Sequence, residues 1–493
     1  MSIFKLFTNK TLFWVMFVVI VGGWFLYALC DYYFLGIRIW DTGLHVQPVL
    51  HWVLYGEYID KFLADGGVHP FVNHFRPLLL VLAPFLYLWQ TMLVIHLAKV
   101  IAFASCPLIF LYFGKKFGLE KLMFAIPTLW LIHDVLITVM YAGNQSTTLS
   151  LPFIVLAFML AMNKSYRLMW LPLLAVVFFK ENLPLVWICL GMFIGVEQKK
   201  WKLGSLIITL GILSGLLIYF VIIPGVAAGT MQHSANAFQP FTLIGEKIQM
   251  LIRVYLTMGF FVFFRPQAIL YTLPAYAVYL IAGKSVYPAL FLNFHYHDFT
   301  TAILFCAGFF FLVKTKEGQT RFNIQLKGQR RYLKVCLVIM MLFYIAKTPY
   351  IRMIQKSAQY PLAFKIRQTA EQAKETIVKN NHIYVVGTIM DVFINLRYIH
   401  AFEFRDNNHI DPYIQQKPFT IIFPTHPKFS LLPTSFVSQY VGFLNQHHKK
   451  GLCSLTIYNK DQDEELIVVN YSEKLPVSEQ KKLIALLDQY SER

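Results

Sequence analysis

The residues best suited to chemistry follow the first hydrophobic segment, between Asp31 and Pro77. Although only 14% of the chain is charged, this stretch gathers carboxylates and histidines: Asp31, Asp41, Glu57, Asp60, Asp65, His45, His51, His69 and His74. Carboxylates and imidazoles transfer protons and bind metals near neutral pH. Asp41 and His45 are four residues apart, so a helix there would place both on one face. The other interpretation is a solvated loop that connects two helices.

Composition identifies the surroundings of this stretch as a membrane. The 493 residues are 57% hydrophobic, the mean hydropathy is +0.53, and apolar runs recur along the chain. The net charge of +18 comes from short basic clusters between these runs. Such clusters are typical of cytoplasmic loops under the positive-inside rule, so the charge requires no nucleic acid partner. The six cysteines show neither metal nor disulfide spacing.

The apolar runs predict an α-helical polytopic membrane protein with about eleven transmembrane helices. Lys5 and Lys10 precede the first run and place the N-terminus in the cytoplasm. Residues 31–90 then form a large outer loop, in which 78–89 is expected to be an interfacial helix, because a span needs about 20 residues. The basic segment 314–334 is expected in the cytoplasm. The expected spans are 12–30, 91–113, 119–141, 147–162, 167–179, 183–196, 203–224, 249–264, 267–282, 298–313 and 335–346.

The composition changes to that of a soluble domain after residue 346. A helix is expected over 364–380, with Ile366, Ala370, Ala373 and Ile377 on one face. The segments HIYVVG, FTIIFP, SLTIYN and ELIVVNY predict strands, and 478–490 a final helix. We therefore expect a transmembrane domain at 1–346 and a small extracytoplasmic α/β domain at 347–493. Neither GxGxxG nor GxxxxGK[ST] occurs, which argues against a nucleotide-driven pump.

Lys180 and Glu181 form a second candidate site between two apolar runs. Thirteen residues separate Arg167 from Lys180, which is about 20 Å of helix. The hydrocarbon layer is about 30 Å thick, so both charges are expected below the outer surface. Charges at that depth either line a hydrated cavity or pair with each other. The depth favours a cavity over a simple pair.

Two further segments combine histidine with aspartate. His133 and Asp134 lie within an expected span, where a carboxylate indicates either function or a neutralising partner such as Lys180. The segment 293–298 reads NFHYHD and includes Tyr296. Its pattern is more typical of interfacial aromatic residues with snorkelling polar groups than of a site. The four histidines of the outer loop match no tight zinc motif.

Several motifs together resemble a known family. They are D-x-G-x-x-x-Q (Asp41, Gly43, Gln47), H-F-x-P (His74, Phe75, Pro77) ahead of LLLVLAP, and K-E (Lys180, Glu181) at a helix hairpin. Over residues 12–346 the chain resembles a family of bacterial and archaeal polytopic membrane proteins that carries a domain of unknown function. That family looks like a branch of the GT-C glycosyltransferases, which use polyprenyl-phosphate-linked sugars. The chain departs from it after Asp134, where YAGNQSTTLSLP stands in place of F-D-F-H-P-E.

The resemblance implies a GT-C-like inverting glycosyltransferase of a bacterial inner membrane, active on the outer face, with a polyprenyl-phosphate-linked sugar and membrane lipid as partners. Asp41 matches the catalytic carboxylate and would act as general base; a divalent metal ion, if one takes part, would be held by Asp41 and His45. Lys180 would contact the donor phosphate as a point charge. The residues expected to bind the substrate are His45, Gln47, His74, Arg76, Asp134, Lys180, Glu181 and Tyr296.

A polytopic transporter or lipid flippase is the alternative from another class of function. In such a protein Lys180, Glu181 and Asp134 would form an intramembrane relay. Transporters are commonly built from two halves of similar hydropathy. This chain shows no such halves, because its large first loop and its terminal domain have no counterparts. The pattern therefore favours an enzyme.

Overall fold

The computed structural model describes most of the chain, and the statements below concern the described residues only. These are 10–35, 39–60, 68–72, 74–119, 123–142, 146–226, 241–257, 265–281, 297–316, 344, 347–377, 382–386, 389–396, 399–402, 419–426, 434–460, 465–471, 476–479 and 481–482.

The chain forms two compact units. Unit 1 comprises Met1–Leu26, Phe71–Leu79 and His96–Arg352, and unit 2 comprises Tyr27–Pro70, Leu80–Ile95 and Met353–Arg493. The expected outer loop thus contributes residues 71–79 to unit 1 and its flanking parts to unit 2. The division expected at residue 346 separates a transmembrane domain from an extracytoplasmic one. It stays a prediction, because the two units are not defined by the membrane.

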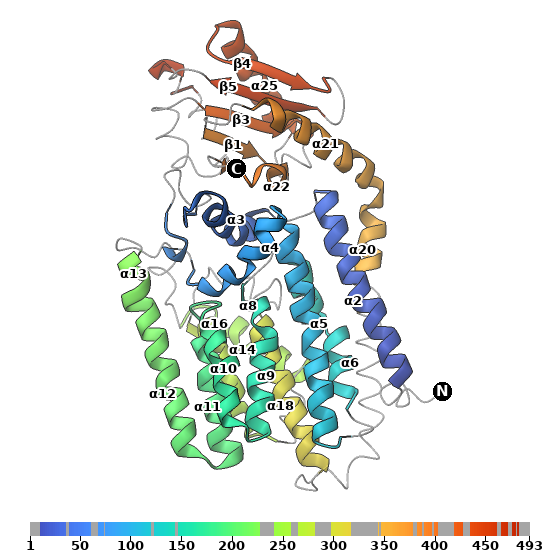
Figure 1. Ribbon diagram of the computed structural model, residues 1–493, viewed down its shortest axis with the longest axis vertical. Helices are drawn as coiled ribbons and strands as arrows, with labels where there is room; N and C mark the ends of the chain where they lie inside the picture. The colour runs from blue at the N-terminus through green and yellow to red at the C-terminus, as the bar shows by residue number, and fades with distance from the viewer. Residues whose placement is uncertain are drawn as a thin grey trace. The chain divides into compact units, whose positions relative to one another are not determined.

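Apolar helices make up unit 1 (Figure 1). Among the described residues, four helical stretches are long and apolar enough to cross a membrane: Lys10–Tyr33, Leu93–Lys116, Trp201–Val226 and Asp298–Thr315. Shorter apolar helices are Pro77–Leu88, Leu151–Met162, Tyr166–Val177, Pro184–Gln198 and Ala268–Ile281. These helices coincide with expected spans, apart from Pro77–Leu88, which coincides with the expected interfacial helix. The number eleven stays a prediction, because the last expected span, 335–346, lies outside the described residues except for Tyr344.

The helices of the chain up to residue 316 have the following bounds. They are α2 (Lys10–Tyr33), α3 (Ile39–Tyr55), η1 (Pro70–Val72), η2 (Pro77–Leu82), α4 (Ala83–Leu88), α5 (Leu93–Lys116), α6 (Ala125–Ile132), α7 (Asp134–Tyr141), α8 (Ser146–Leu149), α9 (Leu151–Met162), α10 (Tyr166–Val177), α11 (Pro184–Gln198), α12 (Trp201–Leu217), the π-helical η4 (Ile218–Ile222), α13 (Ile223–Val226), α14 (Ile244–Thr257), α15 (Ala268–Thr272), η6 (Leu273–Tyr276), α16 (Ala277–Ile281) and α18 (Asp298–Lys316).

Two glycines bring α11 and α12 into backbone contact (Figure 1). A Cβ added to Gly204 would lie 2.5 Å from the carbonyl oxygen of Gly191, and one added to Gly191 would lie 2.6 Å from that of Gly204. No side chain fits at such distances. Small residues allow close helix packing inside a membrane, where apolar burial alone does not drive association.

Unit 2 contains a mixed sheet with helices on both faces. The strands are β1 (His382–Val386), β2 (Ile399–Phe402), β3 (Phe419–Pro424), β4 (Ser454–Tyr458) and β5 (Leu466–Tyr471), in the order β2-β1-β3-β5-β4. β1 pairs in parallel with β2 and β3, whereas β5 runs antiparallel to β3 and β4. Its helices are α20 (Pro349–Lys356), which begins in unit 1, η9 (Ser357–Gln359), α21 (Tyr360–Thr376), α22 (Met390–Phe393) and α25 (Thr434–Lys449).

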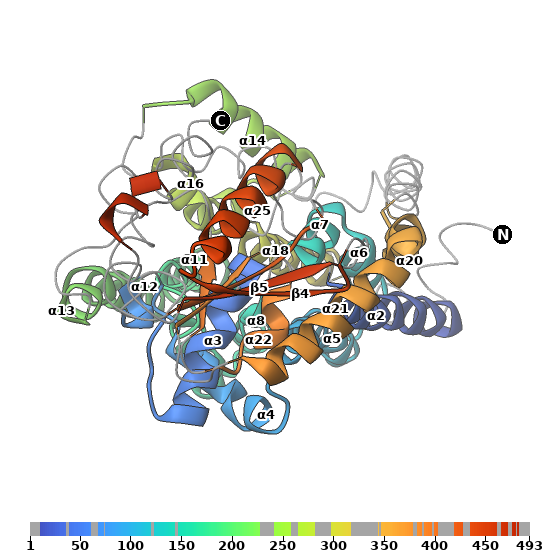
Figure 2. The same cartoon turned by 90° about the horizontal axis from the view of Figure 1, so that it is seen from above.

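Alternation along the strands builds two apolar cores. Ile383 and Val385 of β1 pack with the buried face of α21, whereas Tyr384, between them, packs with residues of α25. Figure 2 shows α25 on one side of the sheet and α21 with α22 on the other. The predicted face is buried against the sheet at all four positions, Ile366, Ala370, Ala373 and Ile377. The helix itself ends at Thr376, and Ile377 has extended backbone angles, so the predicted extension of the helix to residue 380 is wrong at this position. The four predicted strands are present, and the structure adds the short strand β2.

Candidate functional site

Helix α3 carries the first group of candidate residues, in unit 2. Asp41 lies in its first turn, where the helix dipole favours a negative charge. Asp41 and His45 therefore share one helix, as their spacing predicts. Every residue from Thr42 to His51 is buried, although four of them are polar: Thr42, His45, Gln47 and His51. A helix that buries polar side chains on all sides is unusual for a connecting loop, because each polar group must be hydrogen-bonded.

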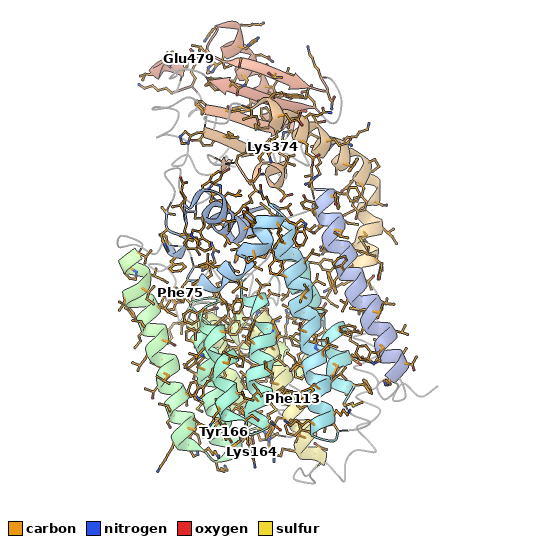
Figure 3. The ribbon with its side chains drawn as sticks, in the orientation of Figure 1. Phe75, Phe113, Lys164, Tyr166, Lys374 and Glu479 are labelled. Carbon is orange, nitrogen blue, oxygen red and sulfur yellow. The ribbon has the colours of Figure 1, made fainter. Side chains whose placement is uncertain are left out.

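The second group of candidate residues lies in unit 1, where Glu181 holds the segment that follows η1. Its Oε1 accepts a hydrogen bond from His74 Nδ1 at 2.8 Å, and its Oε2 accepts one from the backbone N–H of Phe75 at 3.1 Å. The backbone N–H of Leu78 donates to the carbonyl oxygen of Phe178 at 3.0 Å. The turn between α10 and α11 thus binds the H-F-x-P motif at two points and the next residue, Leu78, at a third. Figure 3 labels Phe75.

Cationic groups surround this hydrogen-bonded pair. Lys180 interacts electrostatically with both His74 and Glu181, and Arg76 interacts with His74. Arg76 is 1% exposed, which is exceptional for an arginine. The cluster of His74, Arg76, Lys180 and Glu181 was expected from sequence as separate substrate-binding residues, and the structure brings these four together. Lysine and arginine at one place can bind a phosphate, lysine as a point charge and arginine through its planar fork.

Asp298 belongs to this region, although it was not among the residues expected to bind the substrate. It is 1% exposed, accepts a hydrogen bond from Thr148 Oγ1 at 2.9 Å and caps its own helix through the N–H of Phe299 at 2.7 Å. Lys180 interacts with it electrostatically. Snorkelling at an interface therefore does not describe Asp298. The missed signal was the aspartate at the start of a long apolar helix. Tyr296 lies outside the described residues.

Asp134 has a partner that differs from the expected one. It begins α7 and accepts a hydrogen bond from Lys347 Nζ at 2.5 Å, with both side chains nearly half exposed. The suggestion that Lys180 neutralises Asp134 is therefore wrong. The sequence could not reveal Lys347, which lies 213 positions away. An ion pair of this kind explains Asp134 without a substrate.

The described residues support the predicted metal site only in part. Among the residues that the structure describes, no group of three or more histidines, cysteines and carboxylates is placed to hold one. Asp41 and His45, one turn apart on α3, could supply two ligands and would need a third. The metal stays a prediction, and no step below depends on it.

Comparison with known proteins gives two matches that bear on this geometry. The family model described as "Predicted membrane protein (DUF2079)" matches residues 32–380. The crystal structure of ArnT from Cupriavidus metallidurans bound to undecaprenyl phosphate superposes with a TM-score of 0.54 at 10% sequence identity. That match covers 94% of this chain and 98% of ArnT. No curated protein matches the sequence. At such identity the likeness shows the fold alone, which is that of the GT-C glycosyltransferases.

Proposed function

Because this chain belongs to the DUF2079 family of predicted membrane proteins and has a GT-C-like fold, we propose that it is a glycosyltransferase. It would move a sugar from a polyprenyl-phosphate-linked donor to an acceptor at the outer face of the membrane. The observation that carries the proposal is the GT-C-like fold over nearly the whole chain. ArnT, which shares that fold, was crystallised with undecaprenyl phosphate.

The proposed reaction assigns separate roles to Asp41 and Lys180. Asp41, in the first turn of α3, accepts the proton of the acceptor hydroxyl or amine as that atom attacks the anomeric carbon of the donor sugar. The bond from the anomeric carbon to the phosphate oxygen breaks, and polyprenyl phosphate leaves with the bonding electron pair. Lys180 stabilises the negative charge on the leaving phosphate. Glu181, His74 and the Phe75 N–H fix the turn from which Lys180 projects.

Asp41→Asn tests the catalytic assignment. Asparagine keeps the size of the side chain but cannot take a proton, so release of polyprenyl phosphate from lipid-linked sugars should fall by about 10²- to 10⁴-fold. Asp31→Asn is the matched control, because Asp31 lies beside the same loop and accepts a hydrogen bond from Lys356 at 3.0 Å. Equal rates for wild type and Asp41→Asn would remove Asp41 from the reaction. A wild type that transfers no sugar from a panel of such lipids would contradict the proposed function, and lipid transport without transfer would favour a flippase.

Lys180→Ala tests the donor contact separately. It should weaken binding of undecaprenyl phosphate, measured with the purified protein in detergent, because the charge that meets the phosphate is gone. Lys202→Ala, on the exposed face of α12, is the control. Unchanged affinity in Lys180→Ala would exclude this lysine from the donor site.

A further inference from the structure

The short helix α22 and the turn after it contact helix α3 within unit 2. Tyr55 Oη, in the last turn of α3, donates to the backbone carbonyl oxygen of Asn395 at 2.5 Å. His51 Nε2 donates to the carbonyl oxygen of Leu396 at 3.1 Å. His51 is fully buried, so losing this bond would leave a polar group without water. The turn therefore fixes the C-terminal half of the helix that begins near Asp41.

The same turn binds the connection between α4 and α5, also within unit 2. Asp391 Oδ1 accepts a hydrogen bond from the backbone N–H of Met92 at 2.9 Å. Asn395 Nδ2 donates to Gln90 Oε1 at 3.0 Å. Asp391 lies in α22 and Asn395 in the turn after it, and both side chains bind this connection. One turn of the C-terminal domain therefore binds the outer loop on both sides of residues 56–89.

Two side chains of helix α21, Arg367 and Lys374, bind this turn. Arg367 pairs with Asp391 Oδ2 at 3.4 Å and lies 4.1 Å from the centre of the Tyr32 ring. Lys374 Nζ donates to Asn395 Oδ1 and to the carbonyl oxygen of Val392, each at 2.5 Å; Figure 3 labels Lys374. Asp391 and Arg367 are both buried. Removing either partner would leave the other buried charge without this counterion, so the pair ties the turn to α21.

We propose that residues 390–396, which we term the outer-loop clamp, position helix α3 and thereby Asp41, the proposed general base. The helix that the clamp holds, α3, carries Asp41 in its first turn. The C-terminal domain would then be part of the catalytic framework and not an independent accessory domain. Asn395 is a positioning residue: it touches neither donor nor acceptor. This inference rests on the proposed function.

Two variants loosen the clamp at opposite attachment points. Tyr55→Phe removes one hydroxyl and its bond to the clamp, and Asn395→Ala removes the side-chain bonds to Gln90 and Lys374 while keeping the backbone carbonyl. Tyr458→Phe is the matched control, because Tyr458 Oη also makes a 2.5 Å hydrogen bond in unit 2, to Thr376 Oγ1, away from the loop. Hydrogen–deuterium exchange of full-length protein in detergent micelles, followed by mass spectrometry, reports on the α3 amides. We expect faster exchange of α3 in Tyr55→Phe and faster exchange of 90–95 in Asn395→Ala.

Measuring kcat and KM distinguishes a role in positioning Asp41 from a purely structural role. A displacement of about 1 Å can cost on the order of 100-fold in rate, so both clamp variants should lose roughly 10- to 100-fold in kcat. Their KM for the lipid donor should stay unchanged, because the donor contact is assigned to Lys180. Unchanged exchange in both variants would overturn the clamp. Faster exchange with wild-type kcat would overturn its role in positioning. If the wild type proves inactive, the proposed function fails, while the exchange experiment still decides whether the clamp holds α3.

Discussion

Replacing Glu181 by glutamine should destabilise unit 1 and loosen the H-F-x-P motif. The Glu181 side chain is 8% exposed and receives two hydrogen bonds, from His74 Nδ1 and from the Phe75 N–H. Glutamine keeps one oxygen and places an NH₂ group where the other oxygen was. The amide oxygen can still accept from the Phe75 N–H, and the NH₂ group can donate to His74 Nδ1 only if the imidazole changes tautomer, so both bonds lose the assistance of the negative charge.

The size of the effect follows from these two losses. A hydrogen bond to a charged group is stronger than a neutral one by about 1 kcal/mol, and Glu181 receives two such bonds. Together the two weakened bonds predict a loss of about 1–3 kcal/mol. A larger value would indicate that the whole turn between α10 and α11 rearranges.

Thermal unfolding of the purified protein in detergent measures this loss. Glu246→Gln on α14 is the control, since Glu246 is partly exposed and its loss should change stability by less than about 0.5 kcal/mol. A double-mutant cycle with His74→Ala isolates the contact and should give a coupling energy of about 1 kcal/mol or more. If Glu181→Gln is as stable as Glu246→Gln, or if the cycle gives no coupling, the hydrogen-bond reasoning is refuted.

Three more outcomes test other parts of the molecule. Gly204→Val should lower the thermal stability of the protein by about 1–3 kcal/mol, because α11 and α12 must separate, whereas Gly22→Ala, which meets no atom within 4 Å, should not. Hydrogen bonds from neighbouring lysines hold the pKa of Glu479 at about 2, below its usual 4.5. The contribution of Glu479 to the stability of the C-terminal domain is therefore present above pH 4.5 and lost as the pH falls toward 2. Glu479→Gln should make the unfolding free energy depend less on pH in this acid range. In a background without native cysteines, an impermeant reagent applied to intact cells should label Gln462→Cys but not Gln319→Cys.

Hydropathy predicts where the helices are but not where they break. The expected span 119–141 is two helices, α6 and α7, because His133 has extended backbone angles and its Nδ1 accepts the N–H of Val135. A histidine that caps a helix in the middle of an apolar run leaves no periodic signal. Likewise β2 is four residues long and contains a histidine and an alanine, so no alternating pattern marks it as a strand.

Local spacing predicted the parts of the candidate site but not their partners. Asp41 and His45 follow from a four-residue interval, and Lys180 with Glu181 from the length of the preceding helix. The contact between Glu181 and His74 joins residues 107 positions apart. The H-F-x-P motif distinguishes His74 from His69, five residues earlier, but no signal in the sequence pairs His74 with Glu181. Long-range pairing is set by how helices pack, and packing depends on shape more than on residue type.

Helix α21, which lies within the family match, needs the C-terminal sheet to bury its apolar face. The match ends at residue 380, just before β1, yet it contains α21, whose buried face packs on Ile383, Val385, Ile422 and Val468. Burying a single isoleucine such as Ile366 contributes about 1.5–3 kcal/mol, so α21 without the sheet would expose an apolar stripe to water. Arg367 on the same helix supports the outer-loop clamp through Asp391. The sequence region that resembles the family therefore depends, for both its stability and the position of its first loop, on strands that lie beyond it.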